Sequence, residues 1–346
     1  MKINTIFIVL VVFFMAGAKA FAQDPVFTQW ENMPLYFNPA LTGNFDGQLR
    51  CRAIHRNQWA SILKKNSYKT SAVSAEYKFP GGSVRKISVG ALALQEKAGS
   101  LDFRNSAFNI STSVTQHLGN PDNQLHSIVL GLNAGLVTSK IDLEGAHWPD
   151  SMAHTDINSK TSSADVSTGL LWQYRSKTHF SFNLGSALYH LNKPNTSFSD
   201  SNVVRLNHRI NLHGQVEIPI GQKFSVVPSF LFGSQGPSEQ LLFGFNNRWY
   251  PTSNNPNFVQ LGFFAKTTKN YNGSDVSIYV VSAAVEINSF LVGFSFDRFQ
   301  EIESNAYEFS VGYTFNAHGS KGTASNKAHS SAAIPPAGSP DIKGVF

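Results

Sequence analysis

The sequence predicts an all-β protein, a transmembrane antiparallel outer-membrane β-barrel of about 14 strands with an N-terminal plug-like segment. Three observations predict it: an alternating pattern in the last strand-like run, an export signal at the N-terminus, and the order of short and long gaps between strand-length runs. Together they describe a chain that leaves the cytoplasm and crosses a membrane with paired strands.

The last run alternates strictly between two kinds of side chain. Large apolar side chains occupy positions 307, 309, 311, 313 and 315, with polar or small ones between them. A period of two is typical of a strand with one face in lipid and the other in water. We assign barrel closure to Tyr313 and Phe315 in this run, because pairing of the last strand with the first leaves no unpaired edge in lipid.

The N-terminus has the parts of a secretory signal peptide. Lys2 precedes an apolar run over residues 6–18. Two small-x-small patterns typical of a cleavage site follow, one ending at Ala20 and the other at Ala22. We predict cleavage after Ala22, which makes residues 1–22 the signal peptide. The apolar run is too short to span a membrane comfortably as an uncleaved anchor. We therefore expect an exported protein of the cell outer membrane.

Composition fits a barrel and excludes other classes. The chain has 28 Phe, 10 Tyr and 5 Trp but only 14% charged residues, which suits a lipid-facing wall with aromatic girdles. Cys51 is the single cysteine, so an intrachain disulfide is excluded. The net charge of +6 is scattered along the chain without a basic block, so nucleic-acid binding is not expected.

Strand-length runs separated by turn residues fill positions 47–315. The predicted strands cover residues 47–60, 68–80, 85–98, 103–119, 123–141, 162–176, 178–191, 206–220, 223–235, 238–250, 257–269, 275–288, 290–300 and 306–315. Pro228 weakens the ninth, because proline cannot donate to a ladder, and the second and twelfth alternate poorly.

The gaps between the runs supply an independent argument. Those after even-numbered runs are mostly short, with residues 251–256 as an exception, whereas those after odd-numbered runs include the two longest, residues 142–161 and 192–205. Barrels have short periplasmic turns and longer outer loops, so the N-terminus is expected in the periplasm. A soluble β-sandwich also has many short strands but does not require this combination of features.

Two segments lie outside the predicted barrel of residues 47–315. Residues 23–46 are rich in aromatic residues and proline, and we expect them inside the barrel or at its periplasmic mouth. Residues 316–346 are rich in Ser, Ala, Gly, Pro and Lys, and we expect a disordered tail.

The lipid-facing aromatic pattern places polar residues on the opposite strand faces. We interpret these as water-facing lumen residues, either lining a channel or binding a partner: Glu308, Ser310, Thr314, Asp297, Asn183 and Ser181.

No catalytic, cofactor or metal constellation emerges from the sequence. His147 and His154 share a long loop with Asp150 and Asp156, but their spacing matches no known metal site. A Gly-x-Ser-x-Gly nucleophile elbow is absent. We therefore predict a non-enzymatic protein with no cofactor.

Three sequence elements follow the signal peptide in order: Gln23-Asp24-Pro25-Val26-Phe27-Thr28-Gln29, Pro34-Leu35-Tyr36-Phe37-Asn38-Pro39-Ala40-Leu41-Thr42-Gly43 and Arg56-Asn57-Gln58-Trp59. Together they resemble the PorP/SprF family of type IX secretion system outer-membrane proteins of the Bacteroidota. The run over residues 308–315 is also similar to the family's last strand. Met33 and Trp30 depart from the usual residues, and the tail extends beyond the usual end of the family.

The resemblance implies a barrel that helps to export or surface-anchor a cargo protein, such as a gliding adhesin, by docking its C-terminal sorting domain. It implies secretion and motor components as further partners, with outer-membrane lipids around the wall. The motif residues are candidates for a structural or partner-binding role: Pro34, Asn38, Pro39, Gly43, Arg56, Asn57, Gln58 and Trp59. The alternatives are a passive transporter for small solutes, with residues 23–46 as its plug, and an outer-membrane enzyme.

Overall fold

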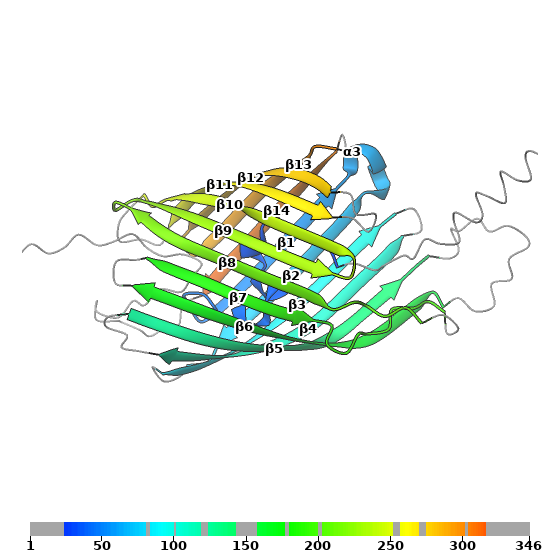
Figure 1. Ribbon diagram of the computed structural model, residues 1–346, viewed down its shortest axis with the longest axis horizontal. Helices are drawn as coiled ribbons and strands as arrows, with labels where there is room; N and C mark the ends of the chain where they lie inside the picture. The colour runs from blue at the N-terminus through cyan, green and yellow to red at the C-terminus, as the bar shows by residue number, and fades with distance from the viewer. Residues whose placement is uncertain are drawn as a thin grey trace, which may run out of the picture.

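The strands form a closed barrel in the computed structural model (Figure 1). Each strand pairs antiparallel with its sequence neighbours, and β1 pairs with β14 to complete the ring. The structure describes residues 24–80, 84–99, 102–118, 124–142, 158–176, 180–199, 203–251, 257–269, 275–301 and 304–315. The predicted signal peptide, the predicted tail and most of the loop over residues 142–161 lie outside these ranges. In the described part of the chain, no helix is long and apolar enough to cross a membrane.

All fourteen predicted strands are confirmed, and their ends differ from the prediction by three residues at most. They are β1 (Leu49–Gln58), β2 (Tyr68–Lys78), β3 (Arg85–Ala98), β4 (Phe103–Leu118), β5 (Gln124–Lys140), β6 (Lys160–Ser176), β7 (Ser181–Tyr189), β8 (Arg209–Ile220), β9 (Phe224–Gln235), β10 (Ser238–Trp249), β11 (Phe258–Lys269), β12 (Asp275–Ile287), β13 (Phe290–Phe299) and β14 (Asn305–Phe315).

The alternating pattern places large apolar side chains on the outer wall. Phe309 is 52% exposed, whereas its neighbours Glu308 and Ser310 are each 1% exposed. The same alternation holds on β13, where Phe294 points outward and Ser295 inward. An apolar outer surface is what a lipid environment requires, because the hydrocarbon core cannot solvate polar groups.

The proline of the ninth strand interrupts one ladder without breaking the strand. Pro228 lies within β9 and opposite Phe245 of β10. On its other side, the β8–β9 pairing stops at Gln215↔Ser229 and resumes at Ile218↔Val226. The missing backbone N–H of proline accounts for a local gap in the hydrogen bonds with β8.

The two ends of the barrel differ in their connections. The two longest loops, between β5 and β6 and between β7 and β8, share one end with the short helices α3 (Ala60–Leu63) and η3 (Lys64–Asn66) that follow β1. We call this the outer end, because outer loops are the longer ones in bacterial barrels. The periplasmic end is the one where β1 begins and β14 ends.

Residues 24–46, here called the N-terminal segment, run through the lumen. They contain three short helices: η1 (Trp30–Asn32), α2 (Pro34–Phe37) and η2 (Pro39–Leu41). Their partners lie on the inward faces of strands around the ring, including β2, β4, β6, β8, β10, β13 and β14. The segment therefore lies in the barrel interior, which is one of the two positions that the sequence predicted for it; the other was the periplasmic mouth.

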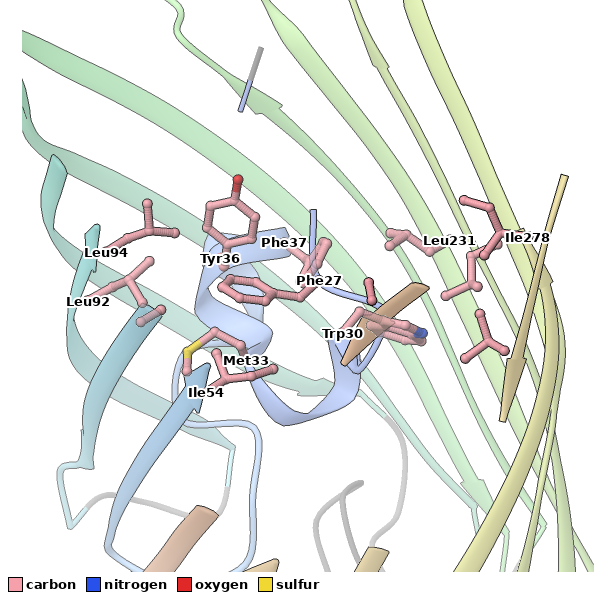
Figure 2. Close-up of a cluster of buried hydrophobic side chains, with 14 of the residues drawn as sticks. Phe27, Trp30, Met33, Tyr36, Phe37, Ile54, Leu92, Leu94, Leu231 and Ile278 are labelled. Atoms are coloured by element: carbon pink, nitrogen blue, oxygen red, sulfur yellow. The ribbon is translucent and has the colours of Figure 1, made fainter. Parts of the chain in front are cut away.

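An apolar cluster joins the segment to the wall on several sides. Figure 2 shows aromatic side chains of the segment between Leu92 on one part of the wall and Ile278 on another. Phe27 and Phe37 are 0% and 2% exposed. Burial of side chains of this size stabilises the folded state by about 1.5–3 kcal/mol each. The lumen is thus a packed core over this part of its length.

Glycines let the segment approach the wall closely. A Cβ added to Gly131 of β5 would lie 2.2 Å from the backbone nitrogen of Ala40, and one added to Gly169 of β6 would lie 1.9 Å from Oδ1 of Asn38. Real Cβ atoms do not come so near to other heavy atoms, so a larger residue at either position would displace η2 from the wall.

Candidate functional site: the N-terminal segment in the barrel lumen

A buried charged group on the outer halves of β1, β13 and β14 holds residues 28 and 29 of the segment. Oε1 and Oε2 of Glu308 accept hydrogen bonds from the backbone N–H groups of Thr28 and Gln29 at 2.6 and 2.8 Å. Nη1 of Arg56 donates to Glu308 at 2.5 Å and to Asp297 at 2.9 Å. Thr28 Oγ1 also donates to Asp297, at 2.7 Å. The guanidinium of β1 thus pairs with carboxylates of β13 and β14, and both carboxylates also bond the segment.

A second group, the outer anchor, holds the first described residue near the outer end. Oδ2 of Asp24 lies 2.8 Å from Nη1 of Arg209 and 2.8 Å from Nε2 of His190. Nδ1 of His190 contacts Oδ2 of Asp165 at 3.0 Å. The backbone N–H of Asp24 donates to Gln235 at 2.8 Å. The chain therefore enters the described structure at the outer end and descends toward the periplasm before β1 begins. The expected periplasmic position holds for the start of β1 but not for the first described residue, because the N-terminal segment runs through the lumen in between.

An epitope inserted directly before Asp24 should therefore be reached by antibody in intact cells, if the signal peptide is removed as predicted. The physical reason is that Asp24 lines an open cavity of about 580 Å³ at the outer end, so residues placed before Asp24 can extend through this cavity to the cell surface. The measurement is surface labelling before and after permeabilisation. The same epitope placed in the short periplasmic turn between β8 and β9 is the matched control. Labelling of both sites only after permeabilisation would contradict this route.

Rising pH should weaken the outer anchor. Burial disfavours the charged form of His190, but the negative charges of Asp24 and Asp165 have the larger combined effect and raise the pKa of His190 from 6.5 to about 9. Against burial, His190 and Arg209 hold the pKa of Asp24 below its ordinary 3.8. Because the pKa of His190 is raised on folding, protonated His190 stabilises the folded state fully below pH 6.5, and this contribution is lost as the pH rises to about 9. Because the pKa of Asp24 is lowered on folding, ionised Asp24 contributes stability above pH 3.8.

The free energy of unfolding of wild type is thus expected to fall between about pH 6.5 and about pH 9. His190→Gln should lack this part of the pH dependence, while retaining the rest. Denaturant unfolding of the refolded barrel across this range measures the difference. Identical slopes for the two proteins would show that the ion pair with Asp24 contributes nothing.

Asn38 joins the middle of the segment to three strands. Its Nδ2 lies 3.1 Å from the carbonyl oxygen of Leu170 on β6, 3.2 Å from that of Ser186 on β7 and 3.0 Å from Nε2 of His213 on β8. Its Oδ1 accepts from the backbone N–H of Ala40 at 2.8 Å and so caps η2. This fully buried amide explains why an asparagine precedes Pro39 at this turn.

Two carboxylates hold the remaining parts of the segment. Glu31 accepts from Asn246 at 3.1 Å and from Arg248 at 3.4 Å. Near the periplasmic end, Glu76 accepts from the backbone N–H of Gly43 at 2.9 Å and from Nε of Arg50 at 2.8 Å. Gly43 has a φ of +74°, the left-handed region that favours glycine.

The structure brings most of the predicted motif residues together in the lumen. Pro34 and Pro39 are buried at the first positions of α2 and η2, where a missing N–H costs no hydrogen bond. Gln58 accepts a bond of 3.3 Å from Nε of Arg56. Asn57 lies apart from the lumen contacts of the segment and pairs with Tyr307 across the β1–β14 ladder. Trp59 packs against the apolar cluster of the lumen, and its ring lies 4.9 Å from that of Tyr68 near the outer end.

The closing residues lie on the outer wall. Tyr313 pairs with Cys51 and Phe315 with Leu49 in the ladder between β14 and β1. Both rings are exposed, with centroids 4.5 Å apart. They contribute to the lipid-facing surface beside the seam, and the hydrogen bonds of the seam come from the backbone.

The interpretation of the lumen residues as water-facing is wrong for five of the six. Glu308, Ser310, Asp297, Asn183 and Ser181 are buried, and Thr314 is half-buried. Glu308 and Asp297 bond the N-terminal segment, and Ser310 donates to Gln29. The alternating pattern identifies the inward face correctly, but it does not show which of these residues the N-terminal segment contacts.

Sequence reasoning missed several residues of the site: Glu31, Glu76, Asp165, His190, Arg209, Glu217 and Arg248. Glu217 accepts from Nη1 of Arg248 at 2.9 Å and so belongs to the same site. The available signal was charged residues at inward positions of neighbouring strands, since isolated buried charges need a partner. The histidines and aspartates weighed as a metal site, at 147, 150, 154 and 156, lie outside the described residues.

A cavity of about 580 Å³ remains above the segment at the outer end. We call it the outer vestibule. Its floor includes Asp24 and Tyr36 of the segment, and its walls include Trp59, Glu96 and Lys266. Aromatic, acidic and basic groups thus converge on a hollow that faces the long loops.

Comparison with solved structures finds other barrels. The CymD monoaromatic hydrocarbon channel is 10% identical, with a TM-score of 0.52 over 83% of this chain and 94% of that chain. CdiB from Acinetobacter baumannii is 7% identical, with a TM-score of 0.46 over 77% of this chain but 60% of its own. Identities this low show the barrel fold alone. No curated protein matches the sequence.

The family comparison covers nearly the whole chain. Residues 19–330 match the model of the family described as type IX secretion system membrane protein PorP/SprF. This range includes the motif residues, the lumen contacts and all fourteen strands. Non-enzymatic membrane proteins make up this family, and the barrel places the chain in the outer membrane. The chain belongs to the PorP/SprF family of type IX secretion system membrane proteins.

Proposed function

We propose that this barrel helps to export a cargo protein or to anchor it at the cell surface, by docking the cargo's C-terminal sorting domain at the outer end. A gliding adhesin is the kind of cargo we expect. The observation that carries the proposal is the lumen itself, which its own N-terminal segment fills while a lined vestibule remains at the outer end.

The outer end offers contacts of two kinds. The vestibule presents aromatic rings and charges of both signs, as with Trp59, Glu96 and Lys266. In the loop between β7 and β8, Val203 and Val204 are 54% and 38% exposed. Exposed apolar residues beside polar ones are typical of protein-binding surfaces. A closed barrel has no free edge for an added strand, so side chains and loops supply the contacts.

A passive transporter is the alternative function. The likeness to the CymD channel is of fold alone, and a diffusion pathway would have to bypass or displace the N-terminal segment. Docking predicts a refolded wild-type barrel without steady ion conductance in planar bilayers, and transport predicts steady conductance. A single conductance recording on one protein preparation therefore distinguishes the two functions.

The docking proposal is tested at the exposed loop. Val203→Asp with Val204→Asp adds charge to the apolar surface, and Lys223→Asp, in a periplasmic turn, is the control for added acid. Affinity purification from native outer membranes should recover at least about tenfold less secreted cargo with the double variant than with wild type. The control should match wild type. Undiminished recovery with the double variant would remove this loop from the docking surface.

A further inference from the structure

The periplasmic half of the lumen holds a second cavity, below the N-terminal segment. It measures about 50 Å³ and lies near the periplasmic ends of β1, β10, β11 and β12. Three arginines line it, Arg50, Arg52 and Arg248, together with Trp30 and Asn44 of the segment. A neighbouring cavity of about 120 Å³ adds Lys78 and Lys86 among its lining residues. Cations outnumber carboxylates in both linings, where Glu31 and Glu286 line the first cavity and Asp46 the second.

Two of the arginines already have carboxylate partners. Nη2 of Arg50 lies 2.7 Å from Oε1 of Glu76. Nη1 of Arg248 lies 2.9 Å from Oε2 of Glu217, and Nη2 lies 3.4 Å from Oε2 of Glu31. These pairs hold the wall together and attach the segment to it, so neither guanidinium is available as a whole to a ligand.

Arg52 differs from both. It is only 6% exposed, yet its Nε and Nη1 have no hydrogen-bond partner among the residues that the structure describes. Glu286 lines the same cavity but bonds neither of these two nitrogens. The side chain lies across Gly312 of β14, where an added Cβ would come 2.4 Å from Cδ of Arg52. The barrel thus provides space for this guanidinium, and the carboxylates of Glu286 and Glu76 interact with its charge, but two of its nitrogens have no acceptor among the described residues.

A buried guanidinium without an acceptor is costly, because both solvation and pairing are lost. Its planar set of donors matches the two oxygens of a carboxylate, and such charge-assisted bonds are among the strongest in proteins. A volume of about 50 Å³ exceeds the space of one water molecule, for which about 10–15 Å³ suffices, and is small for a large ligand. One carboxylate group fits both the size and the charge.

We infer that Arg52 forms a carboxylate-binding site at the periplasmic end, which receives an acidic side chain of a periplasmic protein segment. The nearby Lys78 and Lys86 favour further acidic residues of the same segment. This site lies at the end opposite to the outer vestibule and takes a different ligand. It is therefore independent of cargo docking, and either can fail without the other.

The binding test uses the full chain refolded in detergent and isothermal titration calorimetry. The probe is an acetylated hexapeptide of alternating Glu and Gly, with the Gln–Gly peptide as its uncharged match. Wild type should bind the Glu peptide at least about tenfold more tightly than Arg52→Met does, and should not bind the Gln peptide. Arg298→Gln, an exposed arginine of β13 at the outer end, is the control and should bind as wild type does.

Thermal unfolding supplies a second readout and separates the sources of the carboxylate. Without probe, Arg52→Met should unfold at a higher temperature than wild type, because it removes a buried guanidinium with two unsatisfied donors. The Glu peptide should raise the wild-type temperature but not that of the variant. Stabilisation by sodium acetate and not by the peptide would assign the site to a free small carboxylate. Equal effects on wild type and Arg52→Met, or no effect of either probe on wild type, would overturn the site.

Discussion

Glu308→Gln should destabilise the folded barrel by about 3–5 kcal/mol, the cost of breaking a buried ion pair from one side. The glutamine amide presents an N–H group where the carboxylate accepts from the backbone of Thr28 or Gln29. It also leaves Arg56 with Asp297 as its single buried counter-charge. Denaturant unfolding of the refolded protein measures the loss.

The matched control for this variant is Glu239→Gln. Glu239 is exposed at the outer end of β10, so the same loss of charge should change the free energy of unfolding by less than about 0.5 kcal/mol. Hydrogen exchange of the N-terminal segment should rise in Glu308→Gln and stay unchanged in the control. Equal stability of the two variants would mean that the segment is held by its apolar contacts alone.

Replacing residues 24–43 by a Gly/Ser stretch of equal length should turn the barrel into a conducting pore. The fourteen strand ladders do not include this segment, so the ring should still close. The lumen would lose its packed core, and inward residues such as Leu92 and Ile278 would meet water. Single-channel recording should show steady current where wild type shows none.

The same replacement separates two roles of the segment. It forms the floor of the outer vestibule through Asp24 and Tyr36, so the docking proposal predicts loss of cargo recovery as well as gain of conductance. Full cargo recovery by a conducting barrel would restrict the segment to a structural role. Failure of the barrel to assemble, tested by heat-modifiable migration in gels, would show that the segment is needed for folding.

Strand positions were predictable because the lipid-facing side of each strand requires an apolar residue at every second position. Phe290, Val292 and Phe294 recur at the period of two that a strand between lipid and another medium requires. Ends were less certain, as with β7, which begins at Ser181 rather than at residue 178. Residues 177–180, which precede this strand in the sequence, include no proline or glycine that would mark its beginning.

The sequence predicted a plug-like segment but not its contacts in the lumen, because these contacts join distant residues. Thr28 and Glu308 are separated by 280 positions, and no local pattern records their meeting. One signal was present in the poorly alternating twelfth strand. Ile278 and Val280 of β12 are buried inward while Tyr279 and Val281 are exposed outward, so both faces are apolar. An apolar inward face in a barrel indicates protein in the lumen, not water.

Photo-crosslinking from the outer vestibule tests the docking proposal most directly. A photoreactive amino acid replaces Gln240, which lines the vestibule, and a second variant carries it at Phe309 on the lipid-facing wall. After irradiation of native outer membranes, the docking proposal predicts that Gln240 captures a large secreted protein through its C-terminal sorting domain and that Phe309 does not. Capture of no secreted protein from Gln240, together with steady conductance of the wild-type barrel, would contradict docking and favour passive transport.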